Sequence, residues 1–264
     1  MTPSKCSLAL SATLLVLGLL FTMVVPVGPG STQPAAAQTG TAQPGTESAN
    51  ARWLTDLYRE VLGREADDGG LDHWLGRLAG GGAESRERVV RTLMFSPEGS
   101  RIEVRRAYAE LLGRSTDIGG ENFWTDYLRS RPVTILRSNL IASDEYYAGA
   151  GANDAFIEKL YLEVLGRSVE ADGLRYWSAR LTDGTPRWQL VLAVYLSPES
   201  LGRRADAYAL EILDRTLDRS ERATAIAIIQ SGGERSLRAH FLASDEAFSS
   251  YLTSVGLSHR GEQP

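Results

Sequence analysis

The chain has 264 residues, of which 43% are hydrophobic and 23% are charged, and this composition is ordinary for a soluble globular protein. With 33 acidic against 28 basic residues, the formal net charge is −5, which disfavours binding to the polyanionic backbone of nucleic acid. Cys6 is the only cysteine, so the sequence excludes disulfides within the chain.

Residues 1–37 have the pattern of a signal peptide. Lys5 is followed by an apolar run of about 18 to 20 residues, and the alanine triplet at 35–37 fits a signal-peptidase site before Gln38. A run of this length is also long enough to span a bilayer as one helix. We therefore expect export, with an uncleaved N-terminal anchor as the alternative. Any membrane contact is expected only through this segment.

Residues 38–50 contain no apolar side chain larger than alanine. Such a segment buries too little apolar surface to offset the entropy that it loses on ordering. The sequence therefore predicts a flexible linker here, followed by a folded region at 51–252.

The folded region repeats one motif, in which a Leu-Gly-Arg sequence is followed ten residues later by tryptophan. The glycine, arginine and tryptophan of the three full copies are Gly63, Arg64 and Trp74, then Gly113, Arg114 and Trp124, then Gly166, Arg167 and Trp177. A fourth copy keeps Arg215 but has Asp214 and Ala225 in place of the glycine and the tryptophan. Repetition at a fixed period indicates that one supersecondary unit was duplicated, so the fold is an array.

Each unit is expected to contain three helices. In the first unit, apolar residues recur at helical spacing up to Gly63, which supplies the left-handed residue that ends a helix. Asp67 or Asp68 can cap a second helix, and the glycine run at 80–82 precedes a third. No alternation typical of strands occurs after residue 50. The sequence therefore predicts an all-α fold.

A second repeated signal follows the third helix of each unit. A serine that can cap a helix stands two positions before a glutamate, at Ser96, Ser143, Ser197 and Ser244. The predicted units are about 50 residues long, at about 53–100, 101–149, 153–200 and 201–252. The last is divergent, as terminal repeats commonly are, and decay of a dispensable copy is the alternative explanation. A disordered tail is expected at 253–264.

These motifs resemble the bacterial repeat family catalogued as domain of unknown function 4214. The resemblance rests on Leu-Tyr-Arg-Glu-Val-Leu-Gly-Arg at 57–64 with Asp-Gly-Gly-Leu-Asp-His-Trp at 68–74, and on the similar strings at 160–167 and 172–177. It implies an all-helical module of exported and surface-associated bacterial proteins, with no established reaction. A more distant similarity to phycobilisome linker domains implies scaffolding by protein contact.

The recurring residues are interpreted as structural. An arginine directly after a helix end can bond the terminal carbonyls or pair with the glutamate of the Ser-x-Glu step, and anion binding is the alternative. The tryptophans lie on the apolar face of the second helix and are expected to anchor the core, with sugar stacking as the alternative. A specific function is therefore expected in residues that differ between the copies.

The sequence predicts no catalytic, cofactor or metal site. The three histidines do not recur, and the acidic loops are expected to cap helices because a closed Ca²⁺ site needs more oxygens at constrained spacing. No motif for a serine nucleophile or a phosphate-binding loop is present. We expect a non-catalytic binding or scaffolding module at the cell surface or in the extracellular matrix, with a protein or envelope component as partner. The alternative is an extracellular carbohydrate-binding or carbohydrate-active protein that uses aromatic and carboxylate residues between repeats.

Overall fold

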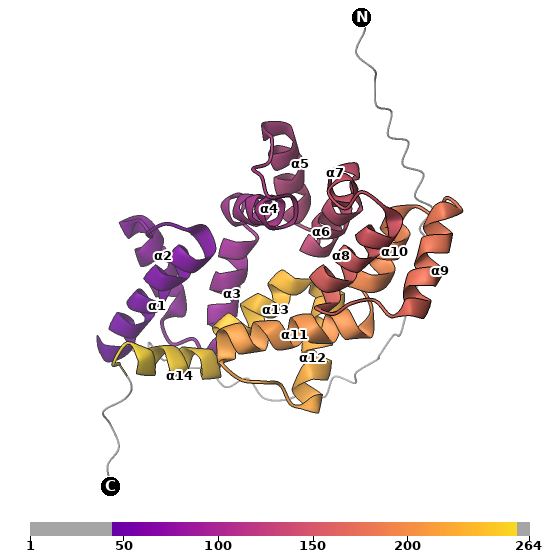
Figure 1. Ribbon diagram of the computed structural model, residues 1–264. Coiled ribbons are helices and arrows are strands. Elements are labelled where there is room, and N and C mark those ends of the chain that lie inside the picture. Colours follow the sequence, from indigo (N-terminus) through magenta and orange to yellow (C-terminus); the bar gives the residue numbers. More distant parts are fainter. Residues whose placement is uncertain (1–43, 258–264) are drawn as a thin grey trace, which may run out of the picture. The chain divides into compact units, whose positions relative to one another are not determined.

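The computed structural model describes residues 44–257, which form fourteen α-helices and no strand (Figure 1). The chain divides between Thr39 and Gly40, and the second unit contains every described residue. The predicted signal peptide, the start of the predicted linker and the end of the predicted tail lie outside the described residues. No helix within 44–257 combines the length and the apolar character that a membrane crossing requires. The all-α repeat architecture is confirmed.

Each repeat contributes three successive helices. Those of the first two repeats are α1 (Pro44–Leu62), α2 (Asp68–Leu78) and α3 (Ala83–Met94), then α4 (Pro97–Leu112), α5 (Ile118–Leu128) and α6 (Val133–Ala142). Those of the last two are α8 (Asn153–Leu165), α9 (Ala171–Thr182) and α10 (Arg187–Tyr195), then α11 (Pro198–Leu213), α12 (Arg219–Gly232) and α13 (Glu234–Ala243). Two further helices, α7 (Asp144–Ala148) and α14 (Asp245–Ser254), begin at the two Ser-Asp-Glu steps.

The ends of these helices follow the local sequence. The first helices of three repeats end at Gly63, Gly113 and Gly166, with φ of 65°, 65° and 68°, in the left-handed region that glycine enters without a steric penalty. Asp214 takes this position in the fourth repeat with φ of 53°. At the opposite ends, four serine side chains accept a backbone N–H three positions on, namely Ser96 from Gly99, Ser143 from Tyr146, Ser197 from Ser200 and Ser244 from Ala247.

Helix α1 begins inside the segment that was predicted as a flexible linker. The helix starts at Pro44, so residues 44–50 are helical and the linker prediction is corrected for them. Ala49 and Asn50 are buried against the rest of the molecule, and this packing orders a segment whose own composition is that of a linker. Proline is well tolerated in the first helical turn.

Two other boundaries differ from the expectation. Ser143 begins only the five-residue α7, because the chain breaks helical geometry at Gly151, where φ is 83°. The first helix of the third repeat therefore starts separately, at Asn153. Helix α14 continues to Ser254, so residues 253 and 254 of the predicted disordered tail are helical.

The repeats pair in an order that differs from their order along the chain. Helix α3 packs on α13, and α6 packs on α10. The first repeat therefore contacts the fourth, and the second contacts the third (Figure 1). Buried residues of the first repeat form one hydrophobic cluster with Ala239 and Ala243 of α13, whereas the second and third repeats share another. Contact between the first and last repeats closes the array.

Both repeat pairs use the same contact. Arg86 donates through Nε to the carbonyl of Ala243 at 2.9 Å and ion pairs with Asp245, and Arg187 donates through Nε to the carbonyl of Ala142 at 3.1 Å and ion pairs with Asp144. The two guanidinium groups lie 4.4 and 4.6 Å from the ring centroids of Phe248 and Tyr147. Every residue of one contact stands 101 positions from its equivalent in the other. The chain thus consists of a two-repeat unit and its duplicate. Each half makes the same contact with the other, as in an approximate twofold arrangement.

Candidate functional site

The arginine of each Leu-Gly-Arg position binds the glutamate of the following Ser-x-Glu step. Nε and Nη2 donate to the two carboxylate oxygens at 2.5 to 2.9 Å, in the pairs Arg64–Glu98, Arg114–Glu145, Arg167–Glu199 and Arg215–Glu246. Nη1 donates to the backbone carbonyl of the next residue in all four copies. We call this bidentate arrangement the arginine clasp. It joins the end of one first helix to the start of a later helix, and this pairing is one of the two structural roles that the sequence suggested for the arginine.

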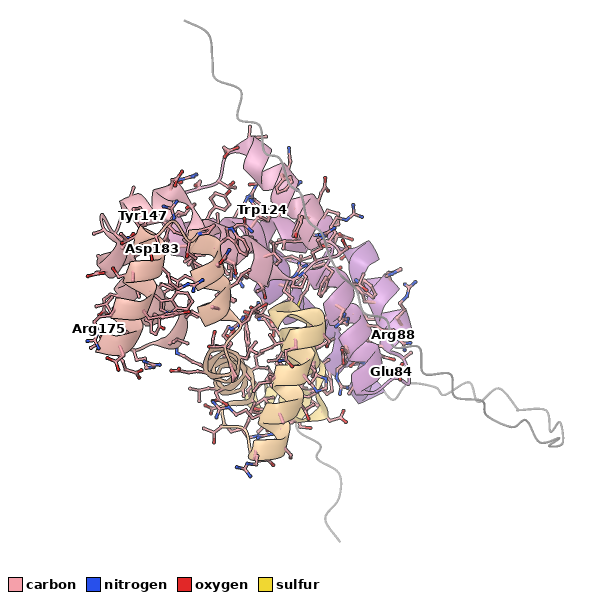
Figure 2. The ribbon with its side chains drawn as sticks, turned by 90° about the vertical axis from the view of Figure 1, so that its right-hand side faces the viewer. Glu84, Arg88, Trp124, Tyr147, Arg175 and Asp183 are labelled. Atoms are coloured by element: carbon pink, nitrogen blue, oxygen red, sulfur yellow. The ribbon has the colours of Figure 1, made fainter. Side chains whose placement is uncertain are left out.

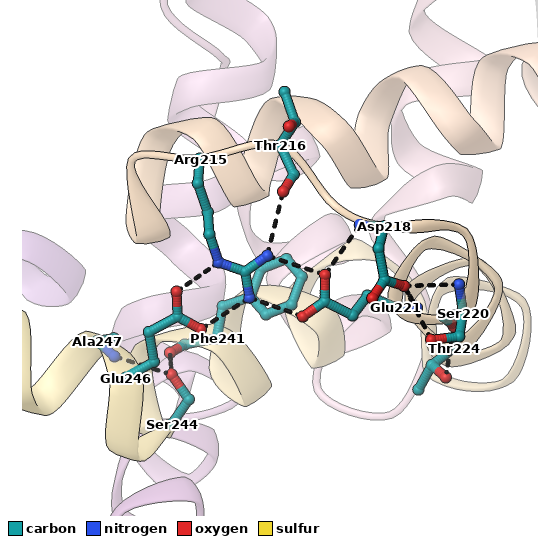
Figure 3. A network of polar contacts seen from close by, with 10 residues as sticks. All are labelled: Arg215, Thr216, Asp218, Ser220, Glu221, Thr224, Phe241, Ser244, Glu246 and Ala247. Carbon is teal, nitrogen blue, oxygen red and sulfur yellow. Dashed lines mark hydrogen bonds and ion pairs between the residues drawn. The ribbon is translucent and has the colours of Figure 1, made fainter.

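The fourth clasp differs in its surroundings (Figure 3). In the first three copies the guanidinium lies 5.3 to 5.7 Å from a tyrosine ring centroid, but Ala209 replaces that tyrosine in the fourth. Instead, the Glu221 carboxylate accepts from Nη1 and Nη2 of Arg215 at 2.8 and 2.7 Å. The other copies have glycine at this position, and a Cβ at Gly70 or Gly120 would stand 3.0 or 3.3 Å from the tyrosine hydroxyl. Tyrosine with glycine has been exchanged for alanine with glutamate.

The three tryptophans are half buried. Trp74, Trp124 and Trp177 each pack one side against a hydrophobic cluster. Trp74 also donates through Nε1 to the Tyr58 hydroxyl at 3.0 Å. In these three repeats the second helix packs mainly on the first helix, and this leaves its outer side in solvent. The expectation of a core anchor therefore describes only the inner side of each ring.

An exposed aromatic ring precedes each tryptophan. His73, Phe123 and Tyr176 meet their neighbouring indoles edge-on, with centroids 4.7 to 5.0 Å apart. Arginines lie over adjacent rings, with Arg77 over Trp74, Arg131 over Tyr127 and Arg180 over Tyr176. Phe123 is 60% exposed and Tyr176 is 53% exposed. We call the three ring pairs the aromatic edge; in Figure 2, Trp124 marks it on α5 and Arg175, beside Tyr176, projects from α9.

A cavity of about 470 Å³ lies between α4, α6, α11 and α13, and we call it the central cavity. Its lining is charged, with six glutamates, Glu60, Glu103, Glu110, Glu163, Glu211 and Glu234, and six arginines, Arg106, Arg137, Arg203, Arg204, Arg235 and Arg238. Ion pairs join Arg204 to Glu234, Arg137 to Glu110, Arg106 to Glu103, and Arg238 to both Glu60 and Glu211. Most of the charge is therefore compensated within the cavity wall.

Equivalent residues of the two halves line the central cavity. Arg137 with Arg238 and Glu110 with Glu211 stand 101 positions apart, and Glu60 with Glu163 stand 103 apart. Other lining residues break this relation. Arg203, Arg204, Glu234 and Arg235 of the second half correspond to Ile102, Glu103, Val133 and Thr134 of the first. The two halves of the chain thus differ at the centre of the molecule.

Arg235 is a buried charge of the central cavity without a carboxylate partner. Only 4% of the residue is exposed. Its guanidinium donates to the carbonyls of Met94 and Leu128 and to the Ser100 hydroxyl. Among the described residues, no carboxylate lies within ion-pair distance of it. Burial lowers the pKa of Arg235 to about 10, so the fold destabilises this charge.

Sequence reasoning missed both the aromatic edge and the central cavity. The edge has a local signal, because the residue before each tryptophan is aromatic in all three copies, although its identity changes. The cavity has a weaker one. Glu234 and Arg235 have the pattern of a solvated helix face, and only their unlike counterparts 101 positions earlier, Val133 and Thr134, distinguish them.

Two of the three acidic loops cap helices as expected, but Glu170 stands at the N-cap of α9 without a side-chain cap hydrogen bond, so the expectation fails for the third loop. Asp67 and Asp117 accept the N–H groups of Gly70 and Gly120 at 2.7 and 2.8 Å. This backbone hydrogen bond holds the pKa of Asp117 below its usual range. Within residues 44–257, no three His, Cys, Asp or Glu side chains are grouped so that they could hold a metal ion.

Comparison with known proteins places the duplication in a family context. A family model described as domain of unknown function (DUF4214) matches residues 35–102 and 137–203. Each matched segment contains one clasp arginine with its Ser-Pro-Glu step, from the first and third repeats respectively. No curated protein and no solved structure matches the chain significantly.

Proposed function

The chain belongs to the family described as domain of unknown function (DUF4214), and on this basis we propose that it is an exported, non-catalytic binding module. Its partner is a protein or an envelope component at the cell surface or in the extracellular matrix. The signal-like pattern of residues 1–37 supports export. Mass spectrometry of the native protein should find a mature terminus near Gln38, and an intact Met1 would instead indicate an anchor.

The aromatic edge carries the binding proposal. Protein interfaces are enriched in aromatic residues and arginine, and these residues dominate binding free energy. Here an exposed ring rests on an indole in three repeats, with arginines beside it. The indoles hold the outer rings in fixed orientations, so little side-chain entropy is lost on binding. The recurring arginines and glutamates are already bound to one another in the clasps, whereas the exposed rings remain available to a partner.

Site-specific photo-crosslinking in the native cell tests this surface. A photoreactive residue in place of Phe123 or Tyr176 should yield an adduct of defined mass with one partner. The matched control is the same residue in place of Arg88, which has a 70% exposed side chain on α3 (Figure 2). Adducts at all three positions, or at none, would contradict the proposal.

The second candidate is carbohydrate binding, which the same exposed rings favour because aromatic faces can stack on sugars. Tryptophan fluorescence during titration with envelope glycans separates the two. Protein binding predicts no saturable change in emission. A saturable shift that disappears in Trp124→Ala, with helical content retained, would favour the carbohydrate function.

A further inference from the structure

We propose that the central cavity binds a small anion that carries a carboxylate or phosphate group. This goes beyond the outer aromatic edge and does not depend on it. The proposal rests on unsatisfied hydrogen-bond donors, on the pairing of charges in the wall and on the difference between the two halves of the chain.

Two buried donors on α13 lack partners. Arg235 and Arg238 are 4% and 8% exposed, and the Nε–H group of each has no hydrogen-bond partner. They stand three positions apart, so they lie on one side of α13, and both line the central cavity. A buried N–H group without an acceptor destabilises the fold. An oxyanion in the cavity would supply acceptors to both once each guanidinium turned its buried Nε–H group toward it.

Two arginines of the wall, and one glutamate, Glu163, have no ion-pair partner among the described residues. Arg235 has no carboxylate partner, and the hydrogen bond of Arg203 goes to the carbonyl of Val164 at 3.4 Å. A planar guanidinium matches carboxylate and phosphate oxygens, and it remains charged at neutral pH. Because burial destabilises the Arg235 charge, a bound anion would raise the pKa of Arg235 back toward its ordinary value.

Two tyrosines add neutral donors to the same wall. Tyr195 and Tyr208 line the central cavity, and burial raises the pKa of each hydroxyl above its usual range. A tyrosine hydroxyl is protonated at neutral pH even at its ordinary pKa, so both can donate to an anion. The cavity volume of about 470 Å³ lies within the range of roughly 300–1,000 Å³ that is typical of small-ligand pockets.

The two unpaired arginines come from one half of the chain. The counterparts of Arg203 and Arg235 are Ile102 and Thr134, whereas Arg238 keeps its counterpart in Arg137. The ion pairs of the wall, including the asymmetric pair Arg204–Glu234, are complete without Arg203 and Arg235. Divergence of these cavity residues between the two halves would turn a wall of two equivalent sides into a single binding site.

Nuclear magnetic resonance of the arginine Nε–H groups tests the site in the full chain. Inorganic phosphate and succinate serve as the probes for the two oxyanion types, with glycerol as a neutral control, at low chloride concentration. We expect one of the two anions to shift the Nε–H resonances of Arg235 and Arg238 saturably, and isothermal calorimetry to give the same affinity. The anion that saturates at the lower concentration identifies the chemical class.

Two variants localise the effect. Arg203→Gln should weaken binding of the preferred anion at least tenfold, while the fold is retained because this side chain is exposed and makes one long hydrogen bond. The matched control Arg88→Gln removes an exposed arginine on α3 and should leave the affinity unchanged. Absence of any saturable shift, or equal weakening by both variants, would overturn the proposal and leave the arginines as a structural network.

Discussion

A single left-handed residue ends the first helix of every repeat, and the four copies occupy it differently. Three use glycine, and the fourth uses Asp214 at φ of 53°. The left-handed region costs an L-residue free energy, although aspartate tolerates it better than most. The geometry is retained because Arg215, the next residue, must still reach Glu221 and Glu246. The backbone at this position is therefore set by the clasp that follows it.

The effect of a substitution at this position on the free energy of unfolding should have opposite signs in the second and fourth copies. Asp214→Gly is expected to raise the free energy of unfolding by about 0.5 kcal/mol, and Gly113→Ala to lower it by about 1 kcal/mol. Urea unfolding followed by circular dichroism measures both. As a control, Gly76→Ala lies within α2 with no atom close to the added Cβ and should be stabilising. A stabilising Gly113→Ala would contradict the left-handed assignment.

At the scale of helices, the arginine clasp ties each repeat to the next helix start. The arginine hydrogen bonds hold the pKa of Glu145, Glu199 and Glu246 below the ordinary value of 4.5. A carboxylate whose pKa is lower in the folded protein stabilises the fold above the pKa of the unfolded chain. This contribution is lost as the pH falls through the folded pKa. Because the pairs are exposed, the effect should be modest and weaker in high salt.

The pH dependence of one variant tests this reading. Glu145→Gln should unfold at a lower temperature than the native protein by a constant amount between pH 6 and 8. Below about pH 4.5 the difference should shrink, since the native carboxylate becomes protonated there too. Thermal unfolding over pH 3 to 8, at low and high salt, provides the measurement. A difference that is independent of pH would show that the clasp acts only as a neutral hydrogen bond.

At the scale of the whole molecule, contacts between the first and last repeats close the array. The rings of Trp53 and Phe248 lie 6.0 Å apart, and the Tyr251 hydroxyl donates to Asp56 at 2.7 Å. These contacts bring α14 against α1, as Figure 1 shows. Each half of the duplication supplies one surface to both repeat pairs. Neither half therefore buries its apolar surface alone.

Because the array is closed, we predict that weakening either repeat pair destabilises the whole fold. Arg86→Met and Arg187→Met should each lower the free energy of unfolding by about 1–3 kcal/mol, because a carbonyl of the partner repeat loses its donor. In both variants the protein should still unfold in one transition. The effect of Arg86 should be larger, since 6% of its side chain is exposed against 27% for Arg187. Calorimetry is the measurement, with Arg88→Met as the exposed control. Two separate transitions would show that the repeat pairs unfold independently.

Local pattern predicted most of the elements and the clasp. Helix ends follow from glycine and serine positions, and the clasp joins residues about 30 positions apart through charges that the repeats display four times. The predicted linker failed at 44–50 because tertiary burial, which composition does not encode, ordered it. The tryptophans were placed on the correct helix, but their exposure depends on what packs on its outer side.

The all-α class, the repeat period, the caps and the arginine clasp follow from the sequence, since helical spacing and short-range hydrogen bonding act within one or two neighbouring elements. The pairing of α3 with α13 and of α6 with α10 does not, and nor does the central cavity. Arg86 and Asp245 are separated by more than 150 positions. A local sequence pattern does not identify so distant a partner. The pattern around a helix arginine is also the same whether the side chain lies in solvent or is buried between repeats. Burial decides between them, and burial is a property of the folded chain.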